Sequence, residues 1–146
     1  MLAPAPAGGL CVMDQRHLLV IDDEIHIVTI LKRRFEAAGW RVTLARDGRQ
    51  GVEAAVACTP DAVVVDYQMP HMDGLEVAEA LFANETTRSA PVLMLTARAH
   101  LIDEERLART NIRDLLSKPF SARELLTRVE KVVGSDTKSG EVEAAA

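Results

Sequence analysis

Four short apolar runs in this sequence each end on polar side chains that could act together in one chemical step. The groups that follow these runs are Asp22 and Asp23, Asp66, Thr96, and Lys118. Three carboxylates held close together must take up a proton or recruit a cation, because like charges repel one another. Mg²⁺ suits such a cluster, since it prefers oxygen ligands and commonly works with one or two carboxylates and phosphate oxygens. The carboxylates therefore predict a magnesium site, provided that the fold brings them together.

The apolar runs LLVI, AVVV, VLML and LLS have the length and composition of buried β-strands. Runs of this kind that alternate with helical patterns are typical of a parallel sheet. In such a sheet the ligand site lies beyond the carboxyl ends of the strands. We therefore expect the polar groups at the four strand ends to meet in one pocket.

Taken one at a time, each of these polar groups also has an ordinary structural interpretation. Asp22 and Asp23 could form a solvated turn that caps the next helix, and Asp66 could be a turn residue at the end of a strand. Thr96 or Lys118 alone would be uninformative. Their joint placement at four strand ends favours a functional site over four separate coincidences.

The composition is that of a soluble globular protein. Of the 146 residues, 48% are hydrophobic and 27% are charged, and no apolar stretch approaches the roughly 18 residues of a membrane span. The net charge of −5 and the isoelectric point near 5.4 argue against direct nucleic-acid contact, which normally needs a basic surface. Cys11 and Cys58 form no metal or redox motif, so we expect reduced thiols and a cytoplasmic location.

The two ends of the chain differ in composition from its middle. Residues 1–16 are rich in Ala, Pro and Gly and lack the features of a signal peptide, so they are expected to be a flexible leader. Met13 is an alternative start to Met1. Residues 134–146 show no apolar periodicity and are expected to be a flexible tail. The ordered unit is therefore predicted at residues 17–133.

Five helices are expected to alternate with the strands, at residues 24–38, 48–58, 73–82, 103–110 and 121–133. The apolar face of the first helix is predicted at Ile27, Ile30, Leu31, Phe35 and Ala38. Asp73 with Glu76, and Ser121 with Glu124, predict capping boxes at two helix starts. Phe82 is expected on the apolar face of the third helix, and Leu101, Ile102 and Leu107 are expected to be the apolar anchors of the fourth.

The second strand, RVTLA at residues 41–45, is more amphipathic than the others and is expected at an edge of the sheet. Right-handed crossovers favour a doubly wound arrangement. We therefore predict an α/β fold, a flavodoxin-like sheet of five parallel strands with five helices. The strand order 2-1-3-4-5 is expected by analogy with other sheets of this kind.

Four motifs occur in a fixed order along the chain: VIDDE at residues 20–24, VVVDYQMPHMDG at 63–74, LTA at 95–97 and SKPF at 117–120. Together they resemble the receiver domain of bacterial two-component response regulators, and the resemblance covers most of the chain. The type that it resembles is the stand-alone, single-domain regulator of chemotaxis.

The resemblance implies a role for each group of the predicted site. Asp66 would be the phosphoacceptor, Thr96 the switch hydroxyl and Lys118 the contact to the phosphoryl group. The Mg²⁺ ligands would be Asp22, Asp23, Asp66 and the backbone carbonyl of Gln68. Mn²⁺ is expected to substitute for Mg²⁺, and the peptide bond before Pro119 is expected to be cis.

The resemblance also implies a function in signal transduction. The chain would take a phosphoryl group from a histidine kinase or a histidine phosphotransfer protein, and would signal through phosphorylation-dependent contacts with a protein target that the sequence does not name. It would not be an enzyme acting on other molecules, although it would catalyse its own phosphorylation from small donors and its own dephosphorylation. No contact with nucleic acid or membrane is expected.

The sequence departs from the family pattern at the switch. Three residues before the lysine, Leu115 replaces the usual Tyr or Phe, and Asn111 and Ile112 replace the usual Gly and Ala. We therefore predict phosphorylation without the usual aromatic rearrangement. Gln68 and Arg98, two residues beyond the phosphoacceptor and the threonine, are expected to tune the lifetime of the phosphoryl group.

Three alternatives remain open at the level of sequence. Phosphatases of the haloacid dehalogenase type also form an aspartyl phosphate, but their nucleophile follows the first strand in a DxD pattern, whereas here that strand ends in DDE. The chain could instead be the receiver part of a larger regulator with an output domain. A receiver that is never phosphorylated is the third alternative, which the complete set of site residues disfavours.

Overall fold

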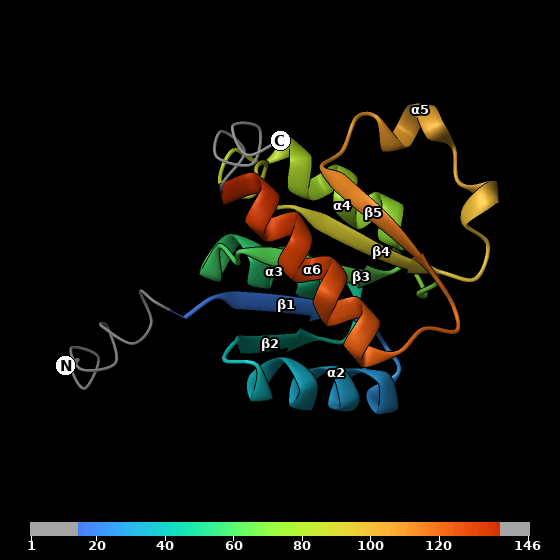
Figure 1. Cartoon of the computed structure of the whole chain (residues 1–146). Helices are drawn as coiled ribbons and strands as arrows, with labels where there is room; N and C mark the ends of the chain where they lie inside the picture. The colour runs from blue at the N-terminus through green and yellow to red at the C-terminus, as the bar shows by residue number, and fades with distance from the viewer. Residues whose placement is uncertain (1–14, 138–146) are drawn as a thin grey trace, which may run out of the picture.

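The computed structural model describes residues 15–137 of the chain. Five parallel strands form one sheet, and helices cover both of its faces (Figure 1). In chain order the elements are β1 His17–Ile21, α2 Ile25–Ala37, β2 Arg41–Ala45, α3 Gly48–Cys58, β3 Ala62–Asp66, α4 Gly74–Ala83, β4 Val92–Thr96, the 3₁₀ turn η1 Ala99–Leu101, α5 Glu104–Leu107, β5 Ile112–Ser117 and α6 Ala122–Thr137.

The strand order is β2-β1-β3-β4-β5, and each pair of neighbours is parallel. The predicted fold class and strand order are therefore confirmed. Every residue of β1, β3 and β4 is buried, whereas β2 is partly exposed, as expected for an edge strand.

The register of the strands aligns their carboxyl ends. The last residue of β1 lies opposite Val65, which places the next residues, Asp22 and Asp66, side by side. In the β4–β5 pair, Thr96 lies opposite the residue that precedes Lys118. The backbone pairing alone therefore brings the predicted groups to one edge of the sheet.

The sheet separates two apolar clusters, because successive residues of a strand point to opposite faces. Leu18, Val20 and Val64 belong to the cluster that packs against α2 and α6. Leu19 and Val63 belong to the cluster that packs against α3 and α4. Figure 1 shows these two pairs of helices on opposite faces of the sheet.

The buried face of α2 differs from the prediction at two positions. Val28, Leu31 and Phe35 are buried, whereas Ile30 is 56% exposed and Ala38 is exposed. The contacting stripe of a surface helix covers only part of its circumference. Val28, Leu31 and Phe35 occupy this stripe, so Ile30 faces away from the sheet.

Of the two predicted capping boxes, the one at α4 is complete, and the one at α6 shows only the hydrogen bond to its serine side chain among the described residues. The Asp73 carboxylate accepts the N–H of Glu76 at 2.8 Å, and the Glu76 side chain accepts the N–H of Asp73 at 2.9 Å, which completes the capping box of α4. Ser121 Oγ accepts the N–H of Glu124 at 3.0 Å before α6. Phe82, expected on the apolar face of α4, is 36% exposed.

The segment between β4 and β5 differs most from the prediction. The expected helix at residues 103–110 is a single turn, α5, capped by Asp103, and it ends where the N–H groups of residues 109–110 bond to carbonyls three residues back. Such tight bonds end an α-helix. Of the three expected anchors, Ile102 is buried as predicted and Leu107 is partly buried, whereas Leu101 is 62% exposed.

The last helix is longer than predicted. It continues through Gly134 to Thr137, into the expected tail at residues 134–146, because Gly134 does not take the positive φ that ends a helix. Residues 1–14, which make up most of the predicted leader, and residues 138–146 lie outside the part that the structure describes. None of the described helices is long and apolar enough to cross a membrane.

Candidate functional site

The polar groups at the four strand ends meet as predicted. The Asp22, Asp66 and Thr96 side chains are buried, and Asp23 is exposed. Lys118 Nζ lies 2.9 Å from Asp66 Oδ1. Each of the three aspartates offers one carboxylate oxygen, and these oxygens lie within 4.8 Å of one another.

The first turn of α4 is packed directly against the backbone of the central aspartate. The N–H of Gly74 donates to the carbonyl of Tyr67 at 2.9 Å. A Cβ on Gly74 would lie 2.6 Å from the backbone oxygen of Asp66, which is closer than carbon and oxygen can approach. Only glycine therefore allows α4 to come this near, as is typical where two backbones must touch.

Two buried carboxylate oxygens in the site are unsatisfied. Asp22 Oδ1 accepts the N–H of Glu24 at 2.9 Å, but Asp22 Oδ2 accepts no hydrogen bond from the residues that the structure describes. The same is true of Asp66 Oδ1, which the Lys118 ammonium meets as an ion pair outside hydrogen-bonding angles. Buried charged oxygens without partners are unfavourable unless a cation compensates them. The donor set therefore fits Mg²⁺, whose ligands are oxygens.

The pKa values in the site reflect this burial. Burial raises the pKa of Asp22 to about 6, although the N–H of Glu24 opposes the shift. Burial also raises the pKa of Asp66, although the Lys118 ammonium acts in the opposite direction and lowers it. Burial lowers the pKa of Lys118, but the neighbouring carboxylate of Asp66 outweighs it and raises the pKa overall. A further positive charge would therefore favour the ionised form of both carboxylates.

The backbone around Thr96 ties its loop to the fifth strand. Thr96 Oγ1 accepts the N–H of Arg98 at 3.0 Å, and the N–H of Lys118 donates to the carbonyl of Thr96 at 2.9 Å. The peptide bond between Lys118 and Pro119 is cis, as expected. The hydroxyl and the ammonium are therefore held on neighbouring strands beside the aspartates.

The remaining predicted residues lie around the site. Gln68 and Arg98 are exposed, and the backbone N–H of Gln68 lowers the pKa of Asp66. The metal contact predicted for the carbonyl of Gln68 stays a prediction. Leu115 is partly buried and packs against the cluster beneath α3 and α4.

Two contributions to the site were not predicted from the sequence. One is the N–H of Glu24, which fixes one oxygen of Asp22. The other is the close approach of Gly74. The close approach of Gly74 had one signal in the sequence, the Asp-Gly pair at the end of the VVVDYQMPHMDG motif. Glycine is the usual residue where a backbone must come close to another group.

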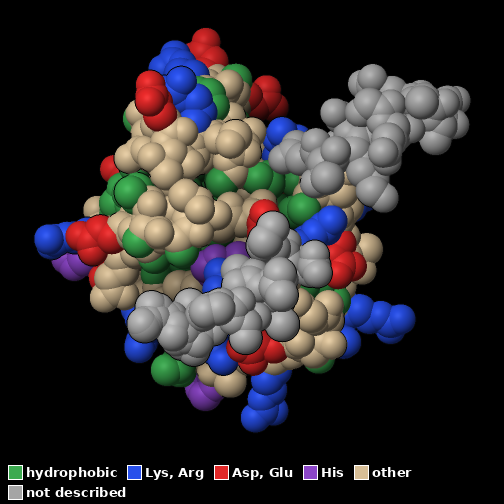
Figure 2. Space-filling model, turned by 90° about the vertical axis from the view of Figure 1, so that its left-hand side faces the viewer, with side chains coloured by type: hydrophobic (Ala, Val, Ile, Leu, Met, Phe, Trp, Pro, Cys, Tyr) green, Lys and Arg blue, Asp and Glu red, His purple; other side chains and the backbone are tan. Residues whose placement is uncertain are grey.

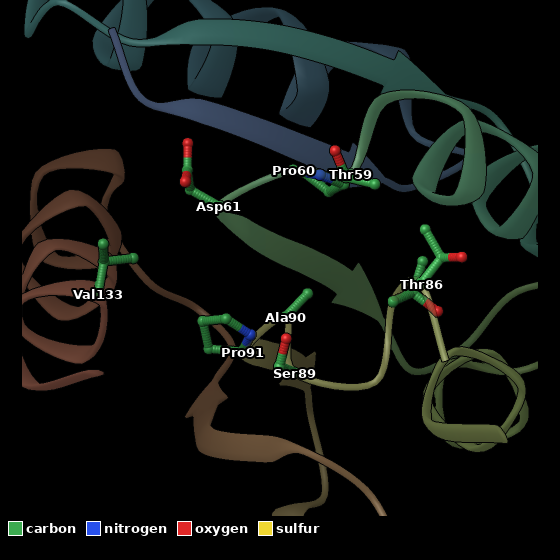
Figure 3. A pocket seen from close by; sticks show the side chains of 9 residues that line it. Thr59, Pro60, Asp61, Thr86, Ser89, Ala90, Pro91 and Val133 are labelled. Atoms are coloured by element: carbon green, nitrogen blue, oxygen red, sulfur yellow. The ribbon is translucent and has the colours of Figure 1, made fainter. Parts of the chain in front are cut away.

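Two hollows lie at the opposite, amino-terminal ends of the strands. One of about 270 Å³ is lined by the hydroxyls of Thr59, Thr86 and Ser89 and by Asp61 (Figure 3). Figure 2 views this end of the molecule, where acidic and basic side chains are interspersed and do not form one charged patch. These hollows contain none of the predicted site residues.

The sequence matches the family model described as the response regulator receiver domain, over residues 18–130. Among curated proteins it is similar to the alkaline phosphatase synthesis transcriptional regulatory protein PhoP of Bacillus subtilis, with 36% identity over 81% of this chain and 48% of that protein. It is also similar to the response regulator MprA of Mycolicibacterium vanbaalenii, with 37% identity over 82% of this chain and 51% of that protein. The chain thus spans about half the length of these relatives.

Solved structures show the same likeness. The chemotaxis protein CheY4 of Vibrio cholerae superposes with a TM-score of 0.75 and 28% identity, covering 81% of this chain and 98% of that one. The receiver domain of the sensor histidine kinase PA1611 from Pseudomonas aeruginosa, solved with a coordinated magnesium ion, gives a TM-score of 0.74 and 31% identity over 83% of this chain and 99% of that one. With its fold, its cluster of aspartates and these matches, the chain belongs to the family of response regulator receiver domains.

Proposed function

We propose that Asp66 accepts a phosphoryl group from a histidine kinase or a histidine phosphotransfer protein, and that the phosphorylated domain signals through altered protein contacts. The observation that carries this proposal is the surroundings of Asp66. Asp66 is 2% exposed, its carboxylate lies 2.9 Å from the Lys118 ammonium, and oxygens of two further carboxylates lie within 4.8 Å of it.

The proposed step is a displacement at phosphorus. A carboxylate oxygen of Asp66 attacks the phosphorus of a phosphohistidine, an O–P bond forms, and the histidine nitrogen leaves with the electron pair of the broken N–P bond. Phosphoryl transfer depends mainly on positioning and on neutralising the charge of the transferred group. Lys118 is placed to supply part of that neutralisation, because its ammonium already contacts Asp66.

The metal of the site would be Mg²⁺, with Mn²⁺ as a substitute. Asp22, Asp23 and Asp66 would hold it, together with the backbone carbonyl of Gln68. The unpartnered oxygen of Asp22 and the clustering of the three carboxylates support this assignment, as does the magnesium named for the PA1611 receiver domain. When bound, the ion would neutralise charge on the phosphoryl oxygens.

The switch would be the hydroxyl of Thr96. After transfer, this hydroxyl can donate to a phosphoryl oxygen, drawing in the loop that follows β4 and biasing an element with two conformations. With Leu115 in place of an aromatic residue, this movement would proceed without the ring rearrangement of the family. The reshaped surface is expected around α5 and β5.

The chemistry of the domain would be confined to its own phosphoryl group. It would take up this group from small acyl phosphates as well as from protein donors, and would release it by hydrolysis. Gln68 and Arg98 are both exposed near the site and would control access of water to the phosphorus. We expect Arg98 to slow the hydrolysis by shielding the phosphoryl group.

The donor protein is expected to dock on the exposed side of α2 and on the loop after β5. Ile25 and Ile30 are 53% and 56% exposed on α2. A donor that covered both side chains would remove their apolar surface from water, which favours association. The domain would act in the cytoplasm, where these donors present their phosphohistidines.

A second candidate for the output concerns the whole protein. Because this chain matches about half the length of PhoP and MprA, the receiver domain could control an output domain elsewhere in a longer chain, as the name of the transcriptional regulator PhoP suggests for that protein. Phosphotransfer to Asp66 would be the same in both cases.

The test is phosphotransfer from a panel of histidine-phosphorylated kinases and phosphotransfer proteins, with Asp66→Asn as the control. We expect rapid transfer from at least one donor to the wild-type domain and none to the variant. Wild-type protein that takes no phosphoryl group from any donor, or from acetyl phosphate with Mg²⁺, would refute the proposal.

A further inference from the structure

The short helix α5 has few apolar contacts to hold it in place. Figure 1 shows that it stands off from the sheet. None of its four residues is buried, and Leu107 only packs partly against the apolar cluster beneath α4. A single exposed helical turn is not stable by itself. Its position must therefore depend on the polar contacts that it makes.

One such contact joins α5 to α4. Arg106 Nε donates to Glu79 Oε2 and Arg106 Nη2 donates to Glu79 Oε1, both at 2.8 Å. The hydrogen bond from Arg106 lowers the pKa of Glu79, and the capping residues Asp73 and Glu76 of α4 also favour the charged form of Arg106. Two parallel bonds between planar groups fix distance and direction together. The pair therefore defines where α5 lies relative to α4.

Both partners of this ion pair are connected to the phosphoacceptor site. The first turn of α4 touches the backbone of Asp66 through Gly74, whose Cβ would lie 2.6 Å from the Asp66 oxygen. On the other side, residues 97–103 join α5 to Thr96. A movement of the loop after Thr96 that reaches α5 therefore either carries Arg106 away from Glu79 or is opposed by the pair.

We infer that the Glu79–Arg106 ion pair restrains α5 in the conformation described here and thereby opposes phosphorylation of Asp66. The inference rests on the proposed function and adds a regulatory contact to it. A bidentate pair tolerates little displacement, so drawing the Thr96 loop toward Asp66 weakens it. By thermodynamic linkage, a contact that stabilises one conformation disfavours any reaction that stabilises the other.

The test compares Glu79→Gln with the wild-type domain. We expect its rate of phosphorylation by acetyl phosphate to rise about two- to five-fold, in keeping with the modest strength of a half-exposed ion pair. Amide hydrogen exchange at Leu107 and Ala108, whose N–H groups close the turn of α5, should also rise before any phosphodonor is added. The exchanged pair Glu79→Arg with Arg106→Glu should return both values toward those of the wild type.

The matched control is Asp114→Asn, which removes the same charge and breaks another 2.8 Å ion pair, from Arg128 of α6 to β5. It should leave the phosphorylation rate unchanged. If the wild type is phosphorylated and Glu79→Gln reacts at the same rate or more slowly, the inference is wrong. If the wild type is not phosphorylated at all, the proposed function fails instead, and raised exchange in α5 of Glu79→Gln then shows only a structural contact.

Discussion

Buried polar groups at the two ends of the sheet differ in whether they have hydrogen-bond partners. At the amino-terminal end, the backbone N–H of His17 donates to Asp61 at 2.8 Å, and the two ring nitrogens of His17 contact Thr43 and Arg41. At the carboxyl end, Asp22 and Asp66 each keep a buried oxygen without a hydrogen bond. Polar groups that satisfy one another stabilise a fold, whereas unsatisfied ones are typical of a site that awaits a ligand.

The contacts of His17 define its protonation. The Arg41 guanidinium can only donate, so it occupies Nδ1 as an acceptor, and Nε2 must carry the proton that goes to Thr43 Oγ1 at 2.6 Å. Burial, followed by the charge of Arg41, lowers the pKa of His17. The neutral ring is therefore part of the fold. Arg41 Nε, which has no partner among the described residues, is the exception at this end.

The comparison predicts that substitutions at the carboxyl end change chemistry and those at the amino end change stability. The largest effect on chemistry short of removing Asp66 is expected for Gly74→Ala. Its Cβ would displace the backbone of Asp66, so phosphorylation by acetyl phosphate should slow about 10- to 100-fold. Overpacking should also reduce the free energy of unfolding by about 1–3 kcal/mol.

Gly134→Ala is the control for Gly74→Ala, because nothing lies within 4 Å of the added Cβ. It should keep the phosphorylation rate and stabilise α6 by about 0.5–1 kcal/mol. Rates and urea denaturation curves measure both quantities. Wild-type kinetics in Gly74→Ala would show that the close approach of α4 is not needed for the chemistry.

The second prediction concerns removal of the metal. Mg²⁺ at 100 times its dissociation constant should raise the free energy of unfolding by about 2.7 kcal/mol, and chelation should abolish this gain. Asp22→Asn should lose most of the gain and should be more stable than the wild type without metal, because it removes a buried carboxylate with an unpartnered oxygen. Denaturation with and without Mg²⁺ tests this.

At the opposite end of the sheet, Asp61→Asn should keep the full stabilisation by Mg²⁺. A similar loss in both variants would mean that the ion acts on the whole protein and not at the aspartate cluster.

The third prediction concerns the amino-terminal end. His17→Gln should reduce the free energy of unfolding by about 1–2 kcal/mol at pH 7, since it disrupts buried hydrogen bonds. Phosphorylation should not change. Because the folded pKa of His17 lies below the ordinary histidine value of 6.5, the unfolded chain binds this proton first as the pH falls. Stability should therefore fall as the pH drops below about 6.5, and this part of the loss should disappear in His17→Gln.

The exposed His26 provides the reference for this measurement. His26→Gln should keep the stability of the wild type at pH 7. A pH profile of His17→Gln that matches the wild type would contradict the role assigned to the buried ring.

The smallest effect is expected for Arg98→Ala. If Arg98 shields the phosphoryl group, the variant should lose this group about two- to three-fold faster, a change of less than about 1 kcal/mol in the barrier. Decay of the phosphorylated protein over time measures the rate. An unchanged or slower decay would contradict the shielding role.

Much of the fold and the site followed from the sequence because both depend on local patterns. Apolar runs define buried strands, and polar residues directly after them lie at one edge of a parallel sheet. These patterns predict that Asp22, Asp66, Thr96 and Lys118 lie together, and the structure confirms their proximity.

What the sequence did not predict depends on how elements pack in three dimensions. The rotation of α2 about its axis determines whether Ile27, Val28 or Ile30 faces the sheet. The spacing of apolar residues does not define this rotation to within one residue. The pairing of Glu79 with Arg106 joins residues 27 positions apart and depends on where a one-turn helix stops. Neither has a local signature.

The most direct test of the central claim is the intact mass of the protein after incubation with acetyl phosphate and Mg²⁺. The account predicts the gain of one phosphoryl group that maps to Asp66, is removed by hydroxylamine, and is absent from Asp66→Asn and after chelation of the metal. A protein that gains no phosphoryl group, or that gains it equally in Asp66→Asn, would contradict the assignment of these strand ends as a phosphoacceptor site.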